Sequence, residues 1–171
     1  MRAVLGVCFA ALVILASPAS SVAQQSAAVF DFEFMDSSLE GELKGKRADE
    51  QARLADVSNQ LRARMAESGR FTLVDIAQVA AQARASNLQA CGACDVTLAG
   101  QVGAELAVTG TVQKVSNLIL NMNIYIREVA TGKLIGAMSA DMRGNTEESW
   151  SRTLDWLVRN RLLAPDYGSH R

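Results

Sequence analysis

The sequence predicts an α/β (α+β) fold: a two-layer mixed β-sheet of about five strands with helices packed on it. Three observations predict it. Segments in which apolar and polar residues alternate, typical of half-buried strands, recur along the chain. Apolar residues at helical spacing run through residues 48–68. The later strands follow one another without helices between them, so the expected order is β-α-β-α-(α)-β-β-β-α.

The first half of the chain predicts two strands, each followed by a helix. In chain order these segments are a strand at 27–34, a polar loop at 35–47, a helix at 48–68, a strand at 71–74 and a short helix after Asp75. In the first strand we expect Phe30, Phe32 and Phe34 on one face, because successive side chains alternate across a strand. Asp75 is a good N-cap for the short helix.

The second half predicts an antiparallel meander closed by a helix. Its segments are a polar connection at 85–95, one short helix through Val102, strands at 105–116, 118–129 and 134–142, and a final helix capped by Asn145 or Thr146. Residues 118–129 carry apolar side chains on one face and mostly polar ones on the other, as in an antiparallel sheet with one wet face. Gly132 permits the tight turn before the last strand.

An export signal is expected at the N-terminus. Arg2 precedes an apolar run over residues 3–16, and Ser21-Val22-Ala23 is a small-x-small cleavage site. The run is shorter than the roughly 20 residues that span a bilayer, which favours cleavage after Ala23 over a retained anchor. We therefore expect residues 1–23 to be a cleaved signal peptide, and the protein to be periplasmic without a stable membrane anchor.

Residues 24–171 are expected to form a single globular domain with a frayed tail after residue 164. Cleavage leaves 171 − 23 = 148 residues, enough to bury a sizeable core. The net charge of −1 gives no electrostatic reason to expect nucleic acid as a partner. His170 is the only histidine, which argues against a His-rich metal site and a Ser-His-Asp triad. We expect no metal, no cofactor and no catalysis.

Cys91 and Cys94 are the only cysteines of the expected mature chain. In the oxidising periplasm the first interpretation is a local disulfide that pins the loop around them. The alternative is a redox-active pair, because Asp95 could begin a helix and a helix N-terminus lowers a thiolate pKa. Against a thioredoxin-like fold, the expected mature chain has a single proline, Pro165, in its tail, where it cannot face the cysteines.

The densest polar cluster lies at residues 141–150, between the last strand and the final helix. The first interpretation is a capped strand-to-helix turn. The alternative is a partner-docking loop with one charged and one aromatic anchor, residue types that are favoured at binding hot spots. The candidate partner-binding residues are Arg143, Asn145, Glu147, Glu148 and Trp150.

Several segments in order resemble a known fold family. They are residues 29–32, 61–75, 103–112 and 129–134. Together they are similar to the periplasmic domains of the curli-secretion lipoprotein family and its relatives. These relatives include the N-terminal domain of the Tol-system propeller protein and outer-membrane lipoproteins that activate penicillin-binding proteins. The resemblance implies an anticodon-binding-domain-like fold and a role in interaction and assembly, although the chain lacks the lipobox cysteine of the lipoprotein members.

Residues 114–120 and 143–150 also resemble a proteobacterial domain-of-unknown-function family of small exported proteins. That resemblance implies a link to periplasmic alcohol-oxidation systems and brings no catalytic residues. We therefore expect a soluble periplasmic accessory protein that binds an envelope protein or a periplasmic oxidoreductase system, in an oligomeric state that the sequence leaves open. The alternatives are a thiol-disulfide redox protein that uses Cys91 and Cys94, and a binder of a small ligand between helices and sheet.

Overall fold

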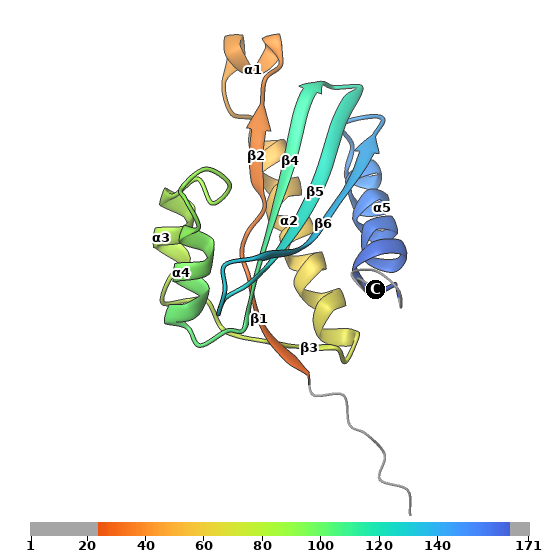
Figure 1. Cartoon of the computed structure of the whole chain (residues 1–171). Coiled ribbons are helices and arrows are strands. Elements are labelled where there is room, and N and C mark those ends of the chain that lie inside the picture. The colour runs from red at the N-terminus through yellow and green to blue at the C-terminus, as the bar shows by residue number, and fades with distance from the viewer. Residues whose placement is uncertain (1–23, 165–171) are drawn as a thin grey trace, which may run out of the picture.

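The computed structural model describes residues 24–164, in which a mixed six-stranded sheet carries helices (Figure 1). The expected signal peptide, 1–23, and the expected frayed tail, 165–171, lie outside the described residues. In chain order the elements are β1 (Gln25–Val29), β2 (Glu33–Asp36), α1 (Leu39–Lys44), α2 (Ala48–Glu67), β3 (Phe71–Leu73), α3 (Ala80–Ala85), α4 (Cys94–Gln101), β4 (Leu106–Ser116), β5 (Ile119–Glu128), β6 (Leu134–Met142), α5 (Glu147–Leu157) and the π-helical turn η1 (Val158–Leu162). None of these helices is long and apolar enough to cross a membrane.

The sheet is parallel on one side and antiparallel on the other. β1 lies between β3 and β4 and is parallel to both. β2 pairs with a later part of β4, again in parallel. β4, β5 and β6 form the antiparallel meander that the alternation predicts. β4 is thus the central strand, because it pairs with β1, β2 and β5, and the mixed α/β class is confirmed.

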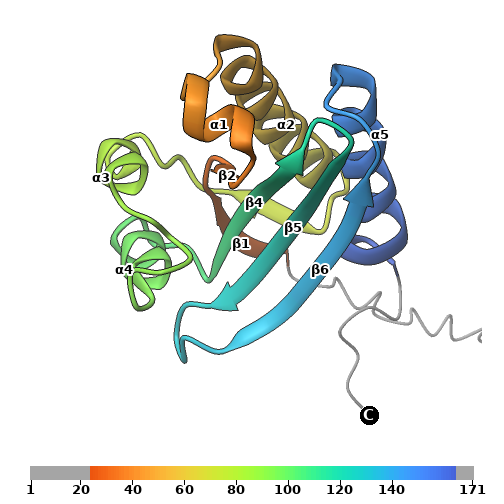
Figure 2. The ribbon, with the colours of Figure 1, turned by 90° about the horizontal axis from the view of Figure 1, so that it is seen from above.

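Helices cover both faces of the sheet near β1 and β4. On one face α2 and α5 enclose the larger core, which includes Leu61 and Trp150. On the other face α3 and α4 enclose a smaller core, which includes Ala83, Leu98 and Ala107 (Figure 2). The prediction of two layers therefore lacked the third layer that α3 and α4 add.

The strand expected over residues 27–34 is interrupted between β1 and β2. There Phe32 donates its N–H to Ser58 Oγ of α2, at 2.9 Å, instead of to a neighbouring strand. Because of the break, Phe30 packs in the smaller core whereas Phe32 lies in the larger one. The prediction that they share one face was wrong, since the side chain that interrupts the strand lies 26 residues further along the chain.

The polar stretch at residues 35–47, expected as a loop, contains α1. Ser38 caps this helix, and its Oγ accepts the N–H of Gly41 at 3.1 Å. The helix has six residues and buries none of them, so no apolar stripe marks it in the sequence. It presents Leu39 and Leu43 to solvent.

Candidate functional site

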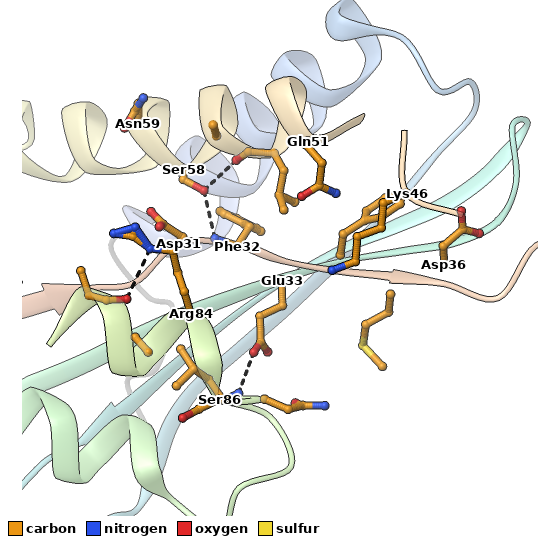
Figure 3. A pocket seen from close by; sticks show the side chains of 18 of the residues that line it. Asp31, Phe32, Glu33, Asp36, Lys46, Gln51, Ser58, Asn59, Arg84 and Ser86 are labelled. Carbon is orange, nitrogen blue, oxygen red and sulfur yellow. Dashed lines mark hydrogen bonds between the residues drawn. The ribbon is translucent and has the colours of Figure 1, made fainter. Parts of the chain in front are cut away.

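A cleft of about 780 Å³ lies between β2, α2 and α3 (Figure 3). Its lining comes from the segment around β2, from α2, and from α3 with the residues that follow it as far as Leu88. These segments meet because α2 packs on one face of the sheet and α3 on the other. The cleft therefore lies at the edge of the sheet, between the two helical layers.

Each helical wall of the cleft combines apolar and polar side chains. The apolar ones are Leu54 and Ala55 of α2 and Ala80 and Ala83 of α3, and the polar ones include Gln51, Asn59 and Arg84. Ser58 is a polar residue on the α2 wall, but its hydroxyl already accepts a hydrogen bond from a backbone N–H and donates one to a carbonyl oxygen. An occupant of the cleft would thus bury apolar surface on both sides.

The charged side chains that line the cleft are Asp31, Glu33, Asp36, Lys46 and Arg84. Asp31 is paired with Arg62, and Asp36 with Lys114. Figure 3 shows Arg84 at the end near Asp31, Lys46 toward the end near Asp36, and Glu33 between them. The cleft therefore has a carboxyl group at its centre and a cation toward each end.

Glu33 differs from Asp31 and Asp36 because its hydrogen-bond partner is a backbone N–H and not a cationic side chain. It is half-buried, and its Oε1 accepts the N–H of Leu88 at 2.6 Å. Burial raises the pKa of the Glu33 carboxyl; hydrogen bonds from the Leu88 and Gln89 backbone oppose the rise, and the charge of Asp95 adds to it. A carboxylate held in this way favours the approach of a cationic group.

A fully buried lysine lies behind Asp36, which lines one end of the cleft. Lys114 Nζ of β4 lies 2.6 Å from Glu50 Oε1, 3.3 Å from Asp36 Oδ2 and 3.4 Å from Glu40 Oε2. Burial alone would lower the pKa of Lys114, but the hydrogen bonds and charges of Glu50 and Asp36 outweigh it and raise the pKa. Since the three carboxylates come from α2, β2 and α1, one ammonium group ties these elements to the central strand.

Two of the predicted partner-binding residues join this lysine cluster and do not line the cleft. Asn145 Nδ2 donates to Glu50 Oε1 at 2.6 Å, and Trp150 Nε1 donates to Asn145 Oδ1 at 3.0 Å. Trp150 is fully buried, and its ring stacks on Phe34 with the ring centres 5.8 Å apart. Asn145 and Trp150 therefore hold the β6–α5 connection on the core, and Trp150 presents no surface to a partner here.

The other predicted partner-binding residues, Arg143, Glu147 and Glu148, are exposed at the same connection. Glu148 forms an ion pair with Arg152 at 2.6 Å. Thr146 caps α5: its side chain accepts a backbone N–H from the first turn at 3.2 Å. A role of the three exposed residues in partner binding stays a prediction.

Cys91 and Cys94 are joined in a disulfide, with their Cα atoms 5.6 Å apart. The bridge closes the turn before α4, in which Ala93 takes a positive φ of 72°. It lies shortly after Leu88, whose N–H contacts Glu33, so it restrains the segment that forms one wall of the cleft. A redox role for the pair stays a prediction.

Exposed apolar side chains occur on α1 and at the adjoining ends of β4 and β5; these segments lie at the top of Figure 1. Each is between 59% and 76% exposed, and we call them the end patch: Leu39, Leu43, Val115, Leu118 and Ile119. Asn117 Nδ2 donates to Glu40 Oε2 at 2.7 Å, which holds the turn beside the helix. Exposed apolar patches mark surfaces that interact with other molecules.

Sequence reasoning predicted neither the end patch nor the cleft that Glu33 lines. For the patch a signal exists: Leu39 and Leu43 lie one helical turn apart directly after Ser38, a good N-cap. For the cleft there is no local signal, because its walls come from three separate segments. In residues 24–164 no group of three or more His, Cys, Asp or Glu side chains could hold a metal ion. The arrangement is suited to binding through apolar and polar wall residues, with the Glu33 carboxylate as a counter-charge for a cationic group.

The fold and the cleft define a class: a mixed α/β domain with an antiparallel meander, helices on both faces, and a binding cleft at the sheet edge. The chain belongs to the DUF3280 family, described as "Protein of unknown function (DUF2380)", which matches residues 25–162. The membership predicted from residues 114–120 and 143–150 is thereby confirmed. No curated protein matches the chain.

Solved structures share the fold at low sequence identity. The C-terminal domain of LpoB from Salmonella enterica is 18% identical with a TM-score of 0.51, and the match covers 72% of this chain and 86% of that one. Lipoprotein GNA1162 from Neisseria meningitidis is 16% identical with a TM-score of 0.46, over 82% of this chain and 98% of that one. The likeness to the LpoB domain supports the mixed α/β assignment.

Proposed function

We propose that this chain is an accessory protein that binds another protein of the periplasm or cell envelope, and that the end patch is its contact surface. The observation that carries the proposal is a set of five apolar side chains, each more than half exposed, on α1 and around the β4–β5 turn, two segments that a hydrogen bond joins. Burial of apolar surface is the main favourable term in association. A surface that is already ordered loses little conformational entropy on binding.

The sequence supports the location and the absence of catalysis in this proposal. A signal peptide over residues 1–23, cleaved after Ala23, would bring residues 24–171 to the periplasm as one mature domain. Its partner there would be an envelope protein or a periplasmic oxidoreductase system. The near-balanced charge offers no attraction to nucleic acid, and the single histidine argues against a Ser-His-Asp triad.

Site-specific photo-crosslinking in cells tests the proposal. A photoreactive amino acid at Leu118, in the end patch, should yield a covalent adduct with one defined protein, and Leu39→Ser should weaken that adduct. The matched control is the same amino acid at Lys133, an exposed residue in the turn between β5 and β6. The proposal fails if crosslinkers at Leu39, Leu43 and Leu118 all give no protein adduct beyond that of the control.

Binding of a small ligand in the cleft is the second candidate function. The cleft volume of about 780 Å³ is of the size that ligand pockets commonly have, and its lining combines apolar side chains with polar groups that could orient a ligand. Native mass spectrometry of the protein isolated from its own cells would detect a retained molecule, which denaturation should release.

A further inference from the structure

The sheet has an empty strand position beside β2. β1 is flanked by β4 on one side and by β3 on the other. The Val74 N–H donates to Ala27 O at 2.9 Å, and the chain then leaves the sheet toward α3. β2 pairs with β4 on one side, and no described strand pairs with its other side. The cleft lies beside this edge of β2 (Figure 3). A further strand there would continue the line of β3, which pairs with β1.

The open edge of β2 directs backbone groups into the cleft. In a parallel ladder, alternate residues direct both N–H and C=O to the same neighbour. Ser37 donates its N–H to Lys114 O at 2.9 Å, so the residues of β2 in phase with Ser37 face β4. Phe34 is out of phase with them and directs its N–H and C=O away from β4. Phe32, in the break before β2, donates its N–H to Ser58 Oγ of α2 and not to β4.

The side walls of this position match the two faces of a strand. Because α2 packs on one face of the sheet and α3 on the other, the space between them continues the sheet layer. An extended segment there would direct alternate side chains to opposite walls. One set would meet Leu54 and Ala55, and the other would meet Ala83 and Leu88.

The charges of the cleft select the side chains of such a segment. The Glu33 carboxylate points to the α3 side, where it contacts the Leu88 N–H. Burial raises the pKa of Glu33, and no ion pair with this carboxylate is found in the described part of the chain. A basic side chain on the α3-facing side would supply the missing counter-charge. Lys46 and Arg84, toward the two ends, disfavour further basic residues (Figure 3).

We propose that the cleft binds an extended segment of a partner protein as an added strand beside β2, with one Lys or Arg facing Glu33 and apolar side chains facing Leu54 and Ala55. Strand addition at an open sheet edge gains affinity from backbone hydrogen bonds and specificity from pockets for alternate side chains. The inference rests on the proposed function in taking the partner to be a protein, but it uses a surface separate from the end patch.

Selection of random nine-residue peptides from a displayed library on the full mature chain tests the inference. The enriched peptides should alternate apolar residues and contain one Lys or Arg. Glu33→Gln keeps an acceptor for the Leu88 N–H but removes the charge, so it should weaken binding about tenfold or more. Ala55→Trp fills the cleft from an exposed helical position and should abolish binding. Leu118→Ser, in the end patch, should leave peptide affinity unchanged.

Amide hydrogen exchange separates strand addition from other binding. The bound peptide should slow exchange of the Phe34 amide, which the ladder phase directs into the cleft. The inference is overturned if no peptide is enriched, if the enriched peptides bind the Ala55→Trp and Glu33→Gln variants as tightly as the parent, or if the Phe34 amide is not protected. A protein crosslinked at Leu118 without any cleft-binding peptide would overturn this inference and leave the proposed function standing.

Discussion

Lys114 keeps its charge in a fully buried position because Glu50, Asp36 and Glu40 surround its ammonium group. Glu50 is equally buried, and its second oxygen, Oε2, has no hydrogen-bond partner. A buried ion pair adds little net stability when whole, because both charges lose their hydration. Removal of one partner is costly, since the other charge then stays buried without compensation.

Lys114→Met should therefore lower the free energy of unfolding by about 3–5 kcal/mol. The matched control is Lys44→Met: Lys44 also pairs with Glu40, but its side chain is 70% exposed. That change should cost less than about 1 kcal/mol. Urea denaturation of the two variants and the parent measures both effects. Equal, small losses in the two variants would show that the buried cluster does not hold α1, α2 and β2 to the central strand.

Lys114 also shows what a sequence cannot reveal about a single residue. It follows Leu106, Val108 and Val112 in the core-facing phase of β4. Period-two alternation therefore places it inside, whereas its charge argues for solvent. Only the carboxylates brought from residues 36, 40 and 50 resolve the conflict.

At the scale of elements, β4 and the β1–β2 segment approach each other closely at Gly110. A Cβ atom added there would overlap the ring of Phe32, whose N–H is held by Ser58. Phe32 also lines the cleft, so this contact sets the position of the cleft relative to the sheet. Gly110 is thus required by packing rather than by its own backbone angles.

Gly110→Ala should lower the free energy of unfolding by about 1–3 kcal/mol, because the ring of Phe32 must move in a packed core. Gly136→Ala is the matched control on β6 of the same sheet. There the nearest atom to an added Cβ, from Ile126, lies at 3.4 Å, so we expect a much smaller change. Thermal and urea unfolding of the two variants compare the sites. Indistinguishable losses would contradict the argument.

Elements defined by local periodicity could be predicted from the sequence almost in full. α2 and the β5–β6 hairpin lie within a residue or two of their expected bounds. α5 is capped by Thr146, one of its two predicted caps. The break between β1 and β2 and the short α1 could not, because a distant side chain causes the first and six exposed residues form the second. The cleft depends on both of these features as well as on α3.

At the scale of the whole molecule, the fold lowers the pKa of some carboxyl groups and raises that of others. Hydrogen bonds from Asn117 and Lys44, with others from the lysine cluster, lower the pKa of Glu40 from 4.5 to about 2. Burial instead raises the pKa of Glu33. The first carboxyl binds its proton less readily in the folded state than in the unfolded state, and the second binds it more readily. Their contributions to stability therefore change in opposite directions on acidification.

Stability contributed by Glu40 should be complete above about pH 4.5 and should be lost as the pH falls toward its folded pKa of about 2. Glu40→Gln should therefore flatten the decline of the unfolding free energy across this window, whereas Glu42→Gln, an exposed neighbour on α1, should not. Glu33→Gln should make the decline of the unfolding free energy on acidification steeper. It removes a charge that burial disfavours, so the unfolding free energy should also rise at neutral pH. Urea unfolding at a series of pH values measures all four slopes. Parallel curves for the parent and Glu40→Gln would contradict the assignment, because they would mean that the network around Lys114 does not hold the Glu40 charge in the folded state.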